Sequence, residues 1–555
     1  MVKSVLPWLR PSVSNPIVWL GSLVGAATLT LPVMALSLSI GPEGINARRL
    51  HEAPYTLTGR KIAIGQVEIG RPSQFGLDKV AYEAMPVMVH RVFYLDDSAA
   101  ADDYVDGHAA NVAGIMISRD KEQPGVAPGA TLYSAAVGPV VDHSGQPEEC
   151  LASQHVALQN GGDVRAINFS FGEPLSRDPR PNPTLDGNAL LTQCIDWSER
   201  VHDVLYVIAG NQGGGGIPIP TDNFNGINVA YSRVENGRYS KVDFSNLGSE
   251  PTFRPMRSPG PESNEGARRS INLVAPGSQI DLIDPDGQRR LASGTSFAAP
   301  HVVGTIALLQ ELADRQIRAG LPNWSLSARK PMVIKAVLLN SADKVQDVGD
   351  GLRLGMSRTL VNQKNQSWLE SDAYRDRTVP LDAELGTGHL NAYRAYQQFE
   401  PGAFSPDAPI PAIGWHYGTV ESPVPPTELP RTSTQVRYQD YVFETPLQAG
   451  SFISATLAWE RFVVLNDANK NELYDIGETF EDRGLNNLDL YLMRAEDDDI
   501  NQSIWSSESK VDSLEHIFHQ IPETGQYKLR VVYRQRVPDE IIQPYALAWW
   551  AVPTK

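Results

Sequence analysis

The sequence has little cysteine and no excess of positive charge. Only two cysteines, Cys150 and Cys194, occur in 555 residues. This count excludes a disulfide framework and leaves open both a single disulfide and two buried thiols. Lysine and arginine number 48 against 65 aspartates and glutamates, so the net charge is −17. This charge disfavours nucleic acid and anionic membrane surfaces as partners.

Long uncharged apolar runs are also scarce, and the one near the N-terminus is informative. Two basic residues precede an apolar segment, residues 17–38, that carries no charge. Ala35 is a small residue where a signal peptidase could cut. We therefore predict that residues 1–38 are an export signal, or else an uncleaved anchor that would be the only membrane contact. In both cases the protein would be extracytoplasmic, either secreted or periplasmic.

Short apolar runs alternate with helix-like stretches between residues 61 and 397. Runs that are apolar at successive positions are typical of strands covered on both faces, as in a parallel sheet. The alternation predicts a doubly wound α/β domain with its chemistry at the carboxyl ends of the strands. The predicted strands are residues 61–68, 130–138, 164–172, 204–211, 226–232 and 271–277, and the predicted helices are residues 108–118, 190–202 and 297–317.

A second, smaller domain is predicted after a proline-rich stretch. Eight prolines lie between residues 401 and 430, a density that helices and interior strands do not tolerate. Beyond them, short runs with partial alternation predict an antiparallel, jelly-roll-like β-sandwich, with strands at residues 451–460, 487–495, 527–534 and 545–553. The predicted order after the export signal is a short linker (39–57), the α/β domain (58–400), a proline-rich linker (401–435) and the sandwich (436–555).

The stretch LASGTSFAAPHVVG, residues 291–304, contains a hydroxyl, Ser296, among small residues at the start of an apolar helix pattern. Small neighbours let the backbone turn sharply. The amino end of the helix would bring unpaired N–H groups and partial positive charge beside the hydroxyl. A helix-capping serine is the alternative. The α/β-hydrolase elbow is excluded, because Ala298 stands where that motif needs glycine.

A serine nucleophile needs a histidine base, and the base needs a carboxylate that orients it. His108 follows Asp106 and Gly107, which suit the start of a small-residue helix. Glu68 ends a buried-looking strand, where an unpaired carboxylate is unfavourable. A solvated histidine and a solvent-facing glutamate are the alternatives. The chain therefore offers a carboxylate, a histidine and a serine in that order.

These motifs resemble those of the subtilisin-like serine peptidases, the subtilases. GTSFAAPHVVG resembles the nucleophile signature, and His108 with VAG at 112–114 resembles the histidine block, followed by GVAPGATLY. INFSFG, VIAGNQG and LVAPG resemble the substrate-pairing strand, the oxyanion-hole turn and the segment that precedes the serine. The matches are collinear over residues 58–400.

The resemblance implies an exported serine endopeptidase with a subtilisin-type fold, acting on polypeptides without an organic cofactor. Ser296 would attack the carbonyl carbon, His108 would act as the base, and Glu68 would orient it. The Asn211 side chain and the Ser296 N–H would hold the oxyanion. We expect a monomer. The residues that would pair with the substrate backbone are Ser170, Phe171 and Gly172.

Three departures from the family pattern leave another interpretation open. The usual acid is aspartate, and Glu68 is one methylene longer. After the histidine, the usual glycine, threonine and second histidine are replaced by Ala109, Ala110 and Asn111, from which we expect altered packing. The stretch between the export signal and Lys61 is too short for the usual inhibitory prodomain. The alternatives are a catalytically inactive binding or surface-scaffold protein and an esterase with the same triad.

DANKNELYDIGE, residues 467–478, has oxygen-bearing side chains at the spacing of a twelve-residue calcium loop. Glu472 occupies position six, where glycine is normal, and no helix pair flanks the segment, so a solvated turn is the alternative. We expect a structural calcium ion rather than a sensor. His516 and His519 have no partner cluster and predict no metal site. The predicted calcium ligands are Asp467, Asn469, Asn471, the Leu473 carbonyl, Asp475 and Glu478.

Overall fold

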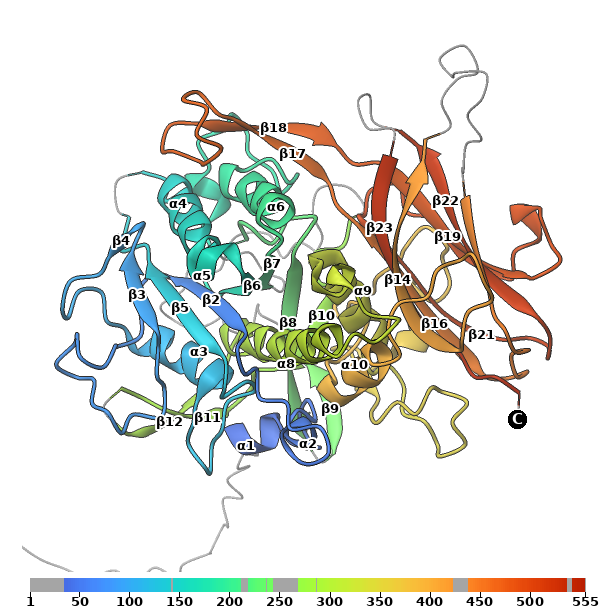
Figure 1. Cartoon of the computed structure of the whole chain (residues 1–555), viewed down its shortest axis with the longest axis horizontal. Helices are drawn as coiled ribbons and strands as arrows, with labels where there is room; N and C mark the ends of the chain where they lie inside the picture. The colour runs from blue at the N-terminus through green and yellow to red at the C-terminus, as the bar shows by residue number, and fades with distance from the viewer. Residues whose placement is uncertain are drawn as a thin grey trace, which may run out of the picture. The chain divides into compact units, whose positions relative to one another are not determined.

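The strands predicted in the first 400 residues lie in one mostly parallel sheet (Figure 1). The computed structural model describes residues 34–140, 143–210, 218–235, 237–242, 268–285, 287–422, 438–536 and 542–554. Within these residues the sheet has ten strands in the order β13-β9-β8-β7-β6-β2-β5-β3-β4, and β10 pairs with β8. Their bounds are β2 (Ala63–Glu68), β3 (Arg91–Tyr94), β4 (Asp97–Ser98), β5 (Thr131–Ala136), β6 (Val164–Phe169), β7 (Leu205–Ala209), β8 (Ile227–Glu235), β9 (Arg238–Lys241), β10 (Leu273–Pro276) and β13 (Leu360–Val361).

All six predicted strands of this region are confirmed, as β2, β5, β6, β7, β8 and β10. They pair in parallel with one another, while β4 pairs with β3 and β9 pairs with β8 in the antiparallel sense. Every residue of β2 and β6 is buried, which explains their continuous apolar character, since both faces of the sheet are covered. Parallel pairing also brings the carboxyl ends of β2, β6 and β7 to the same edge.

Helices cover both faces of the sheet (Figure 1). Helices α3 and α8 pack together on one face, and α4 and α6 pack together on the other. Helix α6 coincides with the prediction, and α3 and α8 differ from it by one or two residues at their ends. The longer helices are α3 (Gly107–Ile117), α4 (Gln146–Ala157), α6 (Leu190–His202), α8 (Ala299–Arg318), α9 (Pro331–Ser341) and α10 (Ala392–Phe399), and the short ones are α1 (Leu36–Ser39), α2 (Arg48–His51) and α5 (Gln159–Gly162).

Residues 39–57 differ from the predicted linker, because their hydrophobic side chains belong to the core. Ile40, Ile45 and Leu50 are fully buried beside α8 and α9 residues in one cluster. Just before them, β1 (Met34–Ala35) pairs with β11 (Ile280–Ile283), which continues into β12 (Arg289–Ala292). Of the predicted export signal, residues 1–33 lie outside the described part of the chain.

The C-terminal part is a β-sandwich, as predicted. Two four-stranded antiparallel sheets have the orders β14-β23-β16-β21 and β15-β22-β19-β20. Residues 413–421, inside the predicted proline-rich linker, form β14 instead, because this stretch contains no proline and lies at a sheet edge. The strands are β14 (Ile413–Glu421), β15 (Tyr438–Val442), β16 (Phe452–Trp459), β19 (Asn487–Arg494), β20 (Trp505–Ser507), β21 (Leu514–Gln520), β22 (Tyr527–Gln535) and β23 (Ile542–Trp550).

The sandwich and the α/β part share hydrophobic contacts. Helix α9 packs on β16 and β23, and Trp415, Ala458 and Ala548 of the sandwich belong to the same buried cluster as α8 and α9. A buried polar contact joins the two parts as well, since Ser454 Oγ donates to Asn340 Oδ1 at 2.8 Å. The sandwich is therefore anchored to the α/β part by core packing.

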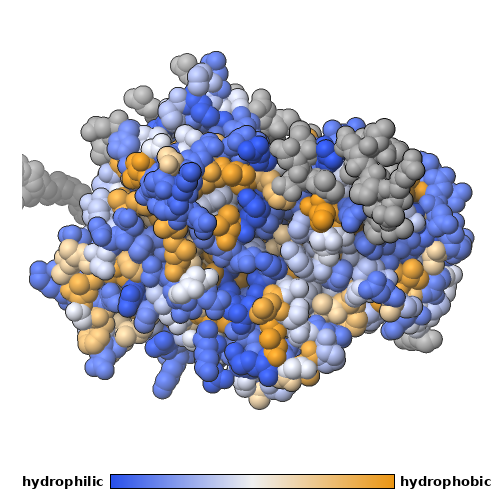
Figure 2. Space-filling view, turned by 45° about the horizontal axis from the view of Figure 1, so that its top comes forward, coloured by the Kyte–Doolittle hydropathy of each residue, from blue (hydrophilic) through white to orange (hydrophobic). Residues whose placement is uncertain are grey.

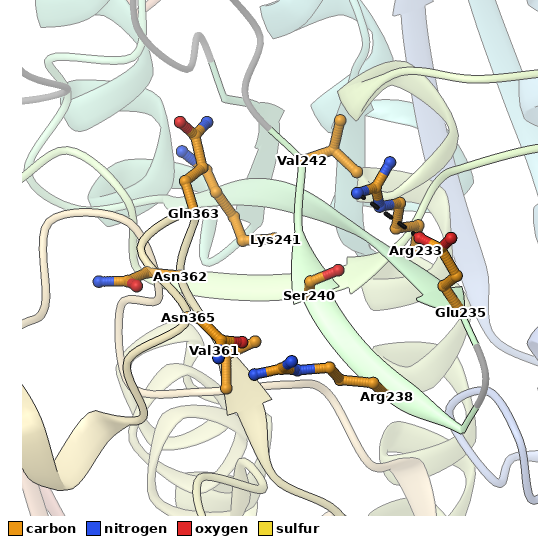
Figure 3. A pocket seen from close by; sticks show the side chains of 10 residues that line it. All are labelled: Arg233, Glu235, Arg238, Ser240, Lys241, Val242, Val361, Asn362, Gln363 and Asn365. Carbon is orange, nitrogen blue, oxygen red and sulfur yellow. Dashed lines mark ion pairs between the residues drawn. The ribbon is translucent and has the colours of Figure 1, made fainter.

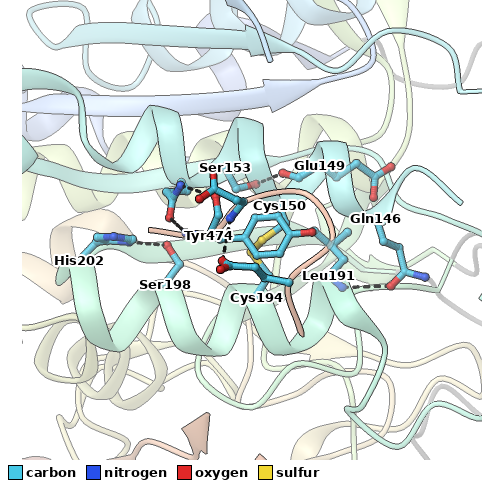
Figure 4. The surroundings of a disulfide bond; sticks show 12 residues. Gln146, Glu149, Cys150, Ser153, Leu191, Cys194, Ser198, His202 and Tyr474 are labelled. Atoms are coloured by element: carbon cyan, nitrogen blue, oxygen red, sulfur yellow. Dashed lines mark hydrogen bonds between the residues drawn. A yellow bond between two sulfur atoms is a disulfide. The ribbon is translucent and has the colours of Figure 1, made fainter. Parts of the chain in front are cut away.

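A hairpin of the sandwich reaches over helix α6. Strands β17 (Phe462–Asn466) and β18 (Thr479–Gly484) contact α6 (Figure 1). Tyr474, in the connecting loop, lies beside a disulfide between Cys150 of α4 and Cys194 of α6 (Figure 4). The Tyr474 main chain forms two hydrogen bonds with the Gln154 amide, at 2.6 and 3.1 Å. The disulfide thus joins two helices at the place that the hairpin covers.

Removing this disulfide should destabilise the protein. The bond links two residues that are 44 positions apart. Closing a loop of that length lowers the conformational entropy of the unfolded chain, which stabilises the folded state by about 4 kcal/mol. We expect the double variant Cys150→Ala/Cys194→Ala to lose about that much free energy of unfolding in guanidinium titrations. Wild-type protein treated with a reductant during unfolding should match the variant. An unchanged unfolding midpoint in both would contradict the expectation.

The surface shown in Figure 2 is mainly hydrophilic, with hydrophobic residues in separate patches. Large hydrophobic side chains that are about half exposed include Phe75, Val80 and Tyr82, which follow β2 along the chain. Among the described residues, no helix combines the length and the apolar character needed to cross a bilayer.

Candidate active site

Glu68 and His108 lie next to each other at the carboxyl edge of the sheet. Glu68 is the last residue of β2 and is buried, whereas His108 lies in the first turn of α3 and is half-buried. His108 Nδ1 is 3.3 Å from Glu68 Oε2. Asp106 caps α3, because its carboxylate accepts a hydrogen bond from the Ala109 N–H at 3.1 Å. The strand end and the helix cap therefore hold the carboxylate and the imidazole in contact.

The two groups change each other's protonation. Burial raises the pKa of the Glu68 carboxyl above its ordinary value, although His108 lowers it in part through its charge and hydrogen bond. Burial also lowers the pKa of His108, but the charge of Glu68, the hydrogen bond with it and the charge of Asp106 outweigh burial and raise that pKa overall. Glu68 Oε1 has no hydrogen-bond partner among the described residues. The pair therefore favours an imidazolium oriented by one carboxylate oxygen.

Ser296 lies in a tight turn just before helix α8. The turn Thr295–Phe297 is a 3₁₀ helix, and α8 begins at Ala299 after a position, Ala298, whose side chain makes no cap. The structure therefore does not support the alternative that Ser296 caps the helix. Gly294, with φ of 148°, starts the turn in a backbone region that favours glycine. The Gly294 N–H donates to the Gly277 carbonyl at 2.8 Å.

The turn that carries Ser296 contacts helix α3, on which His108 lies, but the Ser296 hydroxyl is bonded elsewhere. The His108 ring packs edge-on against the ring of Phe297, with centroids 5.5 Å apart. Ser296 Oγ donates to the Ser170 carbonyl at 3.1 Å, and Ser170 Oγ donates to the Ser296 carbonyl at 3.0 Å. The structure thus brings the serine, the histidine and the glutamate to one edge, with the Ser296 hydroxyl bonded to Ser170.

Two buried amides support this arrangement and were not predicted. Gln66 of β2 and Asn168 of β6 are opposite each other in the sheet and fully buried. Gln66 Nε2 donates to the carbonyl of Ala109, the residue after His108, at 2.9 Å. Asn168 Nδ2 donates to Ser170 Oγ at 2.8 Å. The available signal was an amide inside an otherwise apolar strand, because such a group must be paired when buried.

Ser170, Phe171 and Gly172 follow β6 directly at the same edge. Phe171 is buried and its ring stacks on Phe169, with centroids 4.4 Å apart. No described residue forms a hydrogen bond with the main-chain groups of Phe171 and Gly172. These N–H and C=O groups therefore have no partner within the described part of the chain.

The structure describes only one of the two groups of the predicted oxyanion hole. Asn211 lies outside the described residues, two positions after the end of β7. The main-chain N–H of Ser296 has no hydrogen-bond partner among the described residues. Asn111, in the altered histidine block, donates to Asp284 Oδ1 at 2.8 Å and ties α3 to the loop after β11.

The six predicted calcium ligands lie in the loop between β17 and β18. Asn469 and Asn471 both donate to Asp475 Oδ2, at 2.6 and 2.9 Å, while Asp467 and Glu478 accept hydrogen bonds from main-chain N–H groups of the loop. Among the described residues, no three Asp, Glu, His or Cys side chains gather closely enough to hold a metal by themselves. A calcium ion here would need the amide and main-chain oxygens too.

A parallel α/β sheet with a carboxylate, an imidazole and a serine at the carboxyl ends of its strands is an architecture of serine hydrolases. Residues 59–357 match the model of the subtilase family, Peptidase_S8. This match covers more than half of the 555 residues. The chain therefore belongs to the subtilase family, which consists of serine proteases that act on polypeptides.

Individual relatives are distant. The alkaline protease of Alkalihalobacillus alcalophilus is 25% identical over 339 residues, which cover 56% of this chain and 79% of that protein. Subtilisin Savinase of Lederbergia lenta is 27% identical over 243 residues, 42% of this chain and 76% of that protein. The solved structure of the prenylagaramide maturation protease PagA is 21% identical, covers 61% of this chain and 93% of its own, and has a TM-score of 0.38.

Proposed function

We propose that the protein is an exported serine endopeptidase that hydrolyses peptide bonds through an acyl-enzyme with a Glu68, His108 and Ser296 triad. The observation that carries the proposal is the contact of 3.3 Å between His108 Nδ1 and Glu68 Oε2, beside the turn that presents Ser296. A carboxylate on Nδ1 leaves Nε2 as the nitrogen that can take a proton from the serine hydroxyl.

The first chemical step requires the Ser296 hydroxyl to leave the Ser170 carbonyl, to which it donates at 3.1 Å. Rotation about the serine side-chain bond would turn the hydroxyl toward His108. As Oγ attacks the substrate carbonyl carbon, its proton passes to His108, and Glu68 stabilises the resulting imidazolium. His108 then gives the proton to the leaving amine, and water hydrolyses the acyl-enzyme by the same route.

The negative charge that develops on the substrate oxygen also needs donors. The donors we propose are the side chain of Asn211 and the main-chain N–H of Ser296, which no described residue binds. For substrate positioning, the main-chain groups of Phe171 and Gly172, which have no partner among the described residues, support strand pairing with an extended peptide. The buried Phe171 side chain leaves this contact to the backbone, which suits a binding mode that reads main chain rather than side chains.

A serine-directed fluorophosphonate tests the proposal. The purified wild-type protein should incorporate one equivalent of reagent at Ser296, identified by mass spectrometry, and should cleave denatured casein. Pretreatment with the reagent should remove the cleavage. Absence of both labelling and cleavage would refute the proposal.

One observation favours a second candidate, an inactive subtilase fold that binds a partner. Glu68 replaces the usual aspartate, and one of its carboxylate oxygens has no partner among the described residues. Under this alternative neither wild type nor Glu68→Asp cleaves any peptide, whereas under the peptidase proposal at least the wild type does. Cleavage of both amide and ester substrates would separate a peptidase from an esterase.

We also propose that the loop 467–478 binds a structural calcium ion through Asp467, Asn469, Asn471, the Leu473 carbonyl, Asp475 and Glu478. Support comes from the approach of the Asn469, Asn471 and Asp475 side chains to one another. Glu472 also has a positive φ of 64° at the position where glycine is normal. When bound, calcium would neutralise the loop carboxylates and brace the hairpin that covers the disulfide.

Calcium should therefore raise the thermal stability of the full-length protein. At a concentration about 100 times the dissociation constant, binding adds about 2.7 kcal/mol to the stability of the folded state. We expect a higher unfolding temperature with calcium than with EGTA, and no such difference for Asp467→Asn. Asp499→Asn, a carboxylate outside the loop, should respond like the wild type. No calcium uptake at millimolar concentration in calorimetry would remove this proposal.

For localisation we propose an extracytoplasmic, monomeric protein whose N-terminal segment directs export. The Cys150–Cys194 disulfide supports this proposal, because structural disulfides persist in oxidising compartments. The uncharged apolar segment behind two basic residues supports it too.

A further inference from the structure

One end of the sheet carries a polar face outside the candidate active site. Strands β8, β9 and β13 are neighbours there, and Arg233, Ser240 and Val361 are opposite one another in register. Because side chains alternate along strands, these three share a face with Glu235 and Arg238. Val234, Tyr239 and Leu360 point to the other face and pack in a hydrophobic cluster. The first face is therefore the one turned away from the core.

This face borders a hollow of about 610 Å³ that holds an excess of cations (Figure 3). Its lining includes Arg233, Arg238 and Lys241 but only one carboxylate, Glu235. The Arg233–Glu235 pair is long, at 3.6 Å, and both side chains are nearly half exposed, so the pairing is weak. Lys241 follows Ser240 along β9, so its side chain points away from this face; it is buried, with the Glu384 carboxylate 4.0 Å away, and does not belong to the exposed cations.

Arg238 is the cation best placed to receive a ligand. It forms no ion pair with any described residue, and Figure 3 shows its guanidinium pointing toward Val361 and Asn365. A second hollow of about 420 Å³ shares Arg238 and Val361 with the first. Amide side chains that can donate or accept hydrogen bonds also line the first hollow, namely Asn362, Gln363 and Asn365.

The cationic face lies within reach of a substrate held at the active site. Strands β2, β6, β7 and β8 are consecutive and parallel, so Arg233 lies beyond the same edge as Glu68. In this register Arg233 is three strands across from Glu68 and four residues further along. With strands about 4.8 Å apart and about 3.3 Å per residue, the separation is about 20 Å, which an extended peptide spans in about six residues.

We propose that this face, formed by Arg233, Arg238 and Ser240, is an exosite for an acidic, extended stretch of the polypeptide substrate. The proposal rests on the proposed function and names a substrate class for it. A guanidinium matches a carboxylate with two parallel hydrogen bonds, and the amides around Arg238 can pair with peptide main chain. Because the whole protein carries a charge of −17, a cationic face is where an acidic segment can approach with least repulsion.

Three peptides that share one cleavage sequence test the proposal. Each peptide carries a segment of four identical residues, either glutamates, serines or lysines, that lies six to eight residues from the scissile bond. One set of three peptides has this segment before the bond, and a second set has it after the bond. For the wild type we expect kcat/KM to be about fivefold higher with glutamates than with serines in at least one set, mainly through KM. Arg238→Glu should reverse the order of the glutamate and serine peptides, and Arg238→Lys should keep it. A higher salt concentration should reduce the ratio of their kcat/KM values.

Controls separate this proposal from the proposed function. Arg91→Glu makes the same change of charge on an exposed residue of β3, near the other end of the sheet, and should keep the wild-type preference. A short peptide without the distal segment should be cleaved equally by wild type and Arg238→Glu. If no peptide is cleaved, the proposed function fails. If the three peptides are cleaved equally, or if an oligonucleotide competes and oligoglutamate does not, the exosite is overturned.

Discussion

Ser296→Ala should lower kcat for peptide hydrolysis by about 10⁶-fold, the size of effect found when the nucleophile of subtilisin is removed. The variant lacks the only atom that forms the acyl-enzyme, while the rest of the edge, including the Glu68–His108 contact, stays in place. The measurement is single-turnover and steady-state cleavage of a chromogenic peptide by wild type and variant.

A matched control is available just before the same turn. Ser293 Oγ accepts a hydrogen bond from the Gln279 N–H at 2.8 Å and belongs to the same small-residue stretch. Ser293→Ala should keep most of the activity, and both variants should retain the wild-type unfolding temperature. If Ser296→Ala cleaves peptides as fast as wild type, another residue is the nucleophile and the proposed mechanism is wrong.

Glu68→Gln should lower kcat by about 10⁴-fold, as the loss of the acidic triad member does in serine proteases. An amide cannot stabilise the imidazolium and can hold His108 in the wrong tautomer. Glu68→Asp keeps the charge but withdraws it by one methylene from the present contact of 3.3 Å. Its activity should lie between that of wild type and that of Glu68→Gln, as measured by kcat with one peptide.

The pH profile gives an independent reading of the same pair. His108 must be neutral to act as a base, and its pKa is raised above the ordinary 6.5 by Glu68 and Asp106 despite burial. Activity should therefore be lost as pH falls through a value above 6.5. Glu68→Gln removes the negative charge, so the acid limb of its residual activity should move to lower pH. A limb that does not move would contradict coupling between the two residues.

The central sheet could be predicted because its strands are apolar at successive positions. Residues 61–68 and 164–172 contain β2 and β6, each buried on both faces. Helix α6 begins and ends where the pattern predicts, at Leu190 and His202.

Elements whose partners are distant in the chain could not be predicted. We predicted a linker at residues 39–57 because their apolar residues are isolated in sequence. In the structure, Ile40 and Leu50 are buried in a core that is built mainly from later segments. Helix α9 contacts strands that begin more than 100 residues later, β16 and β23. The number of prolines between residues 401 and 430 led to the prediction of a linker instead of β14, because prolines flank this edge strand without interrupting it.

At the candidate site, the sequence predicted which residues take part but not the hydrogen bonds that they form. The triad candidates stand at a strand end, a helix start and a turn, which local patterns reveal. The direction of the Ser296 hydroxyl, toward the Ser170 carbonyl, depends on two segments 126 residues apart. The amides of Gln66 and Asn168 act across the sheet in the same way.

The joint between helix α9 and strands β16 and β23 limits how the chain can be divided. A fragment that stops near residue 400 would keep every proposed triad member, yet it would uncover the apolar flank of α9 and leave the Asn340 amide without its Ser454 partner. Bare apolar flanks of this kind attract one another. Cutting the chain near residue 400 would therefore expose an apolar surface that favours self-association, and the C-terminal sandwich is best regarded as part of the structural core that holds the candidate site in place.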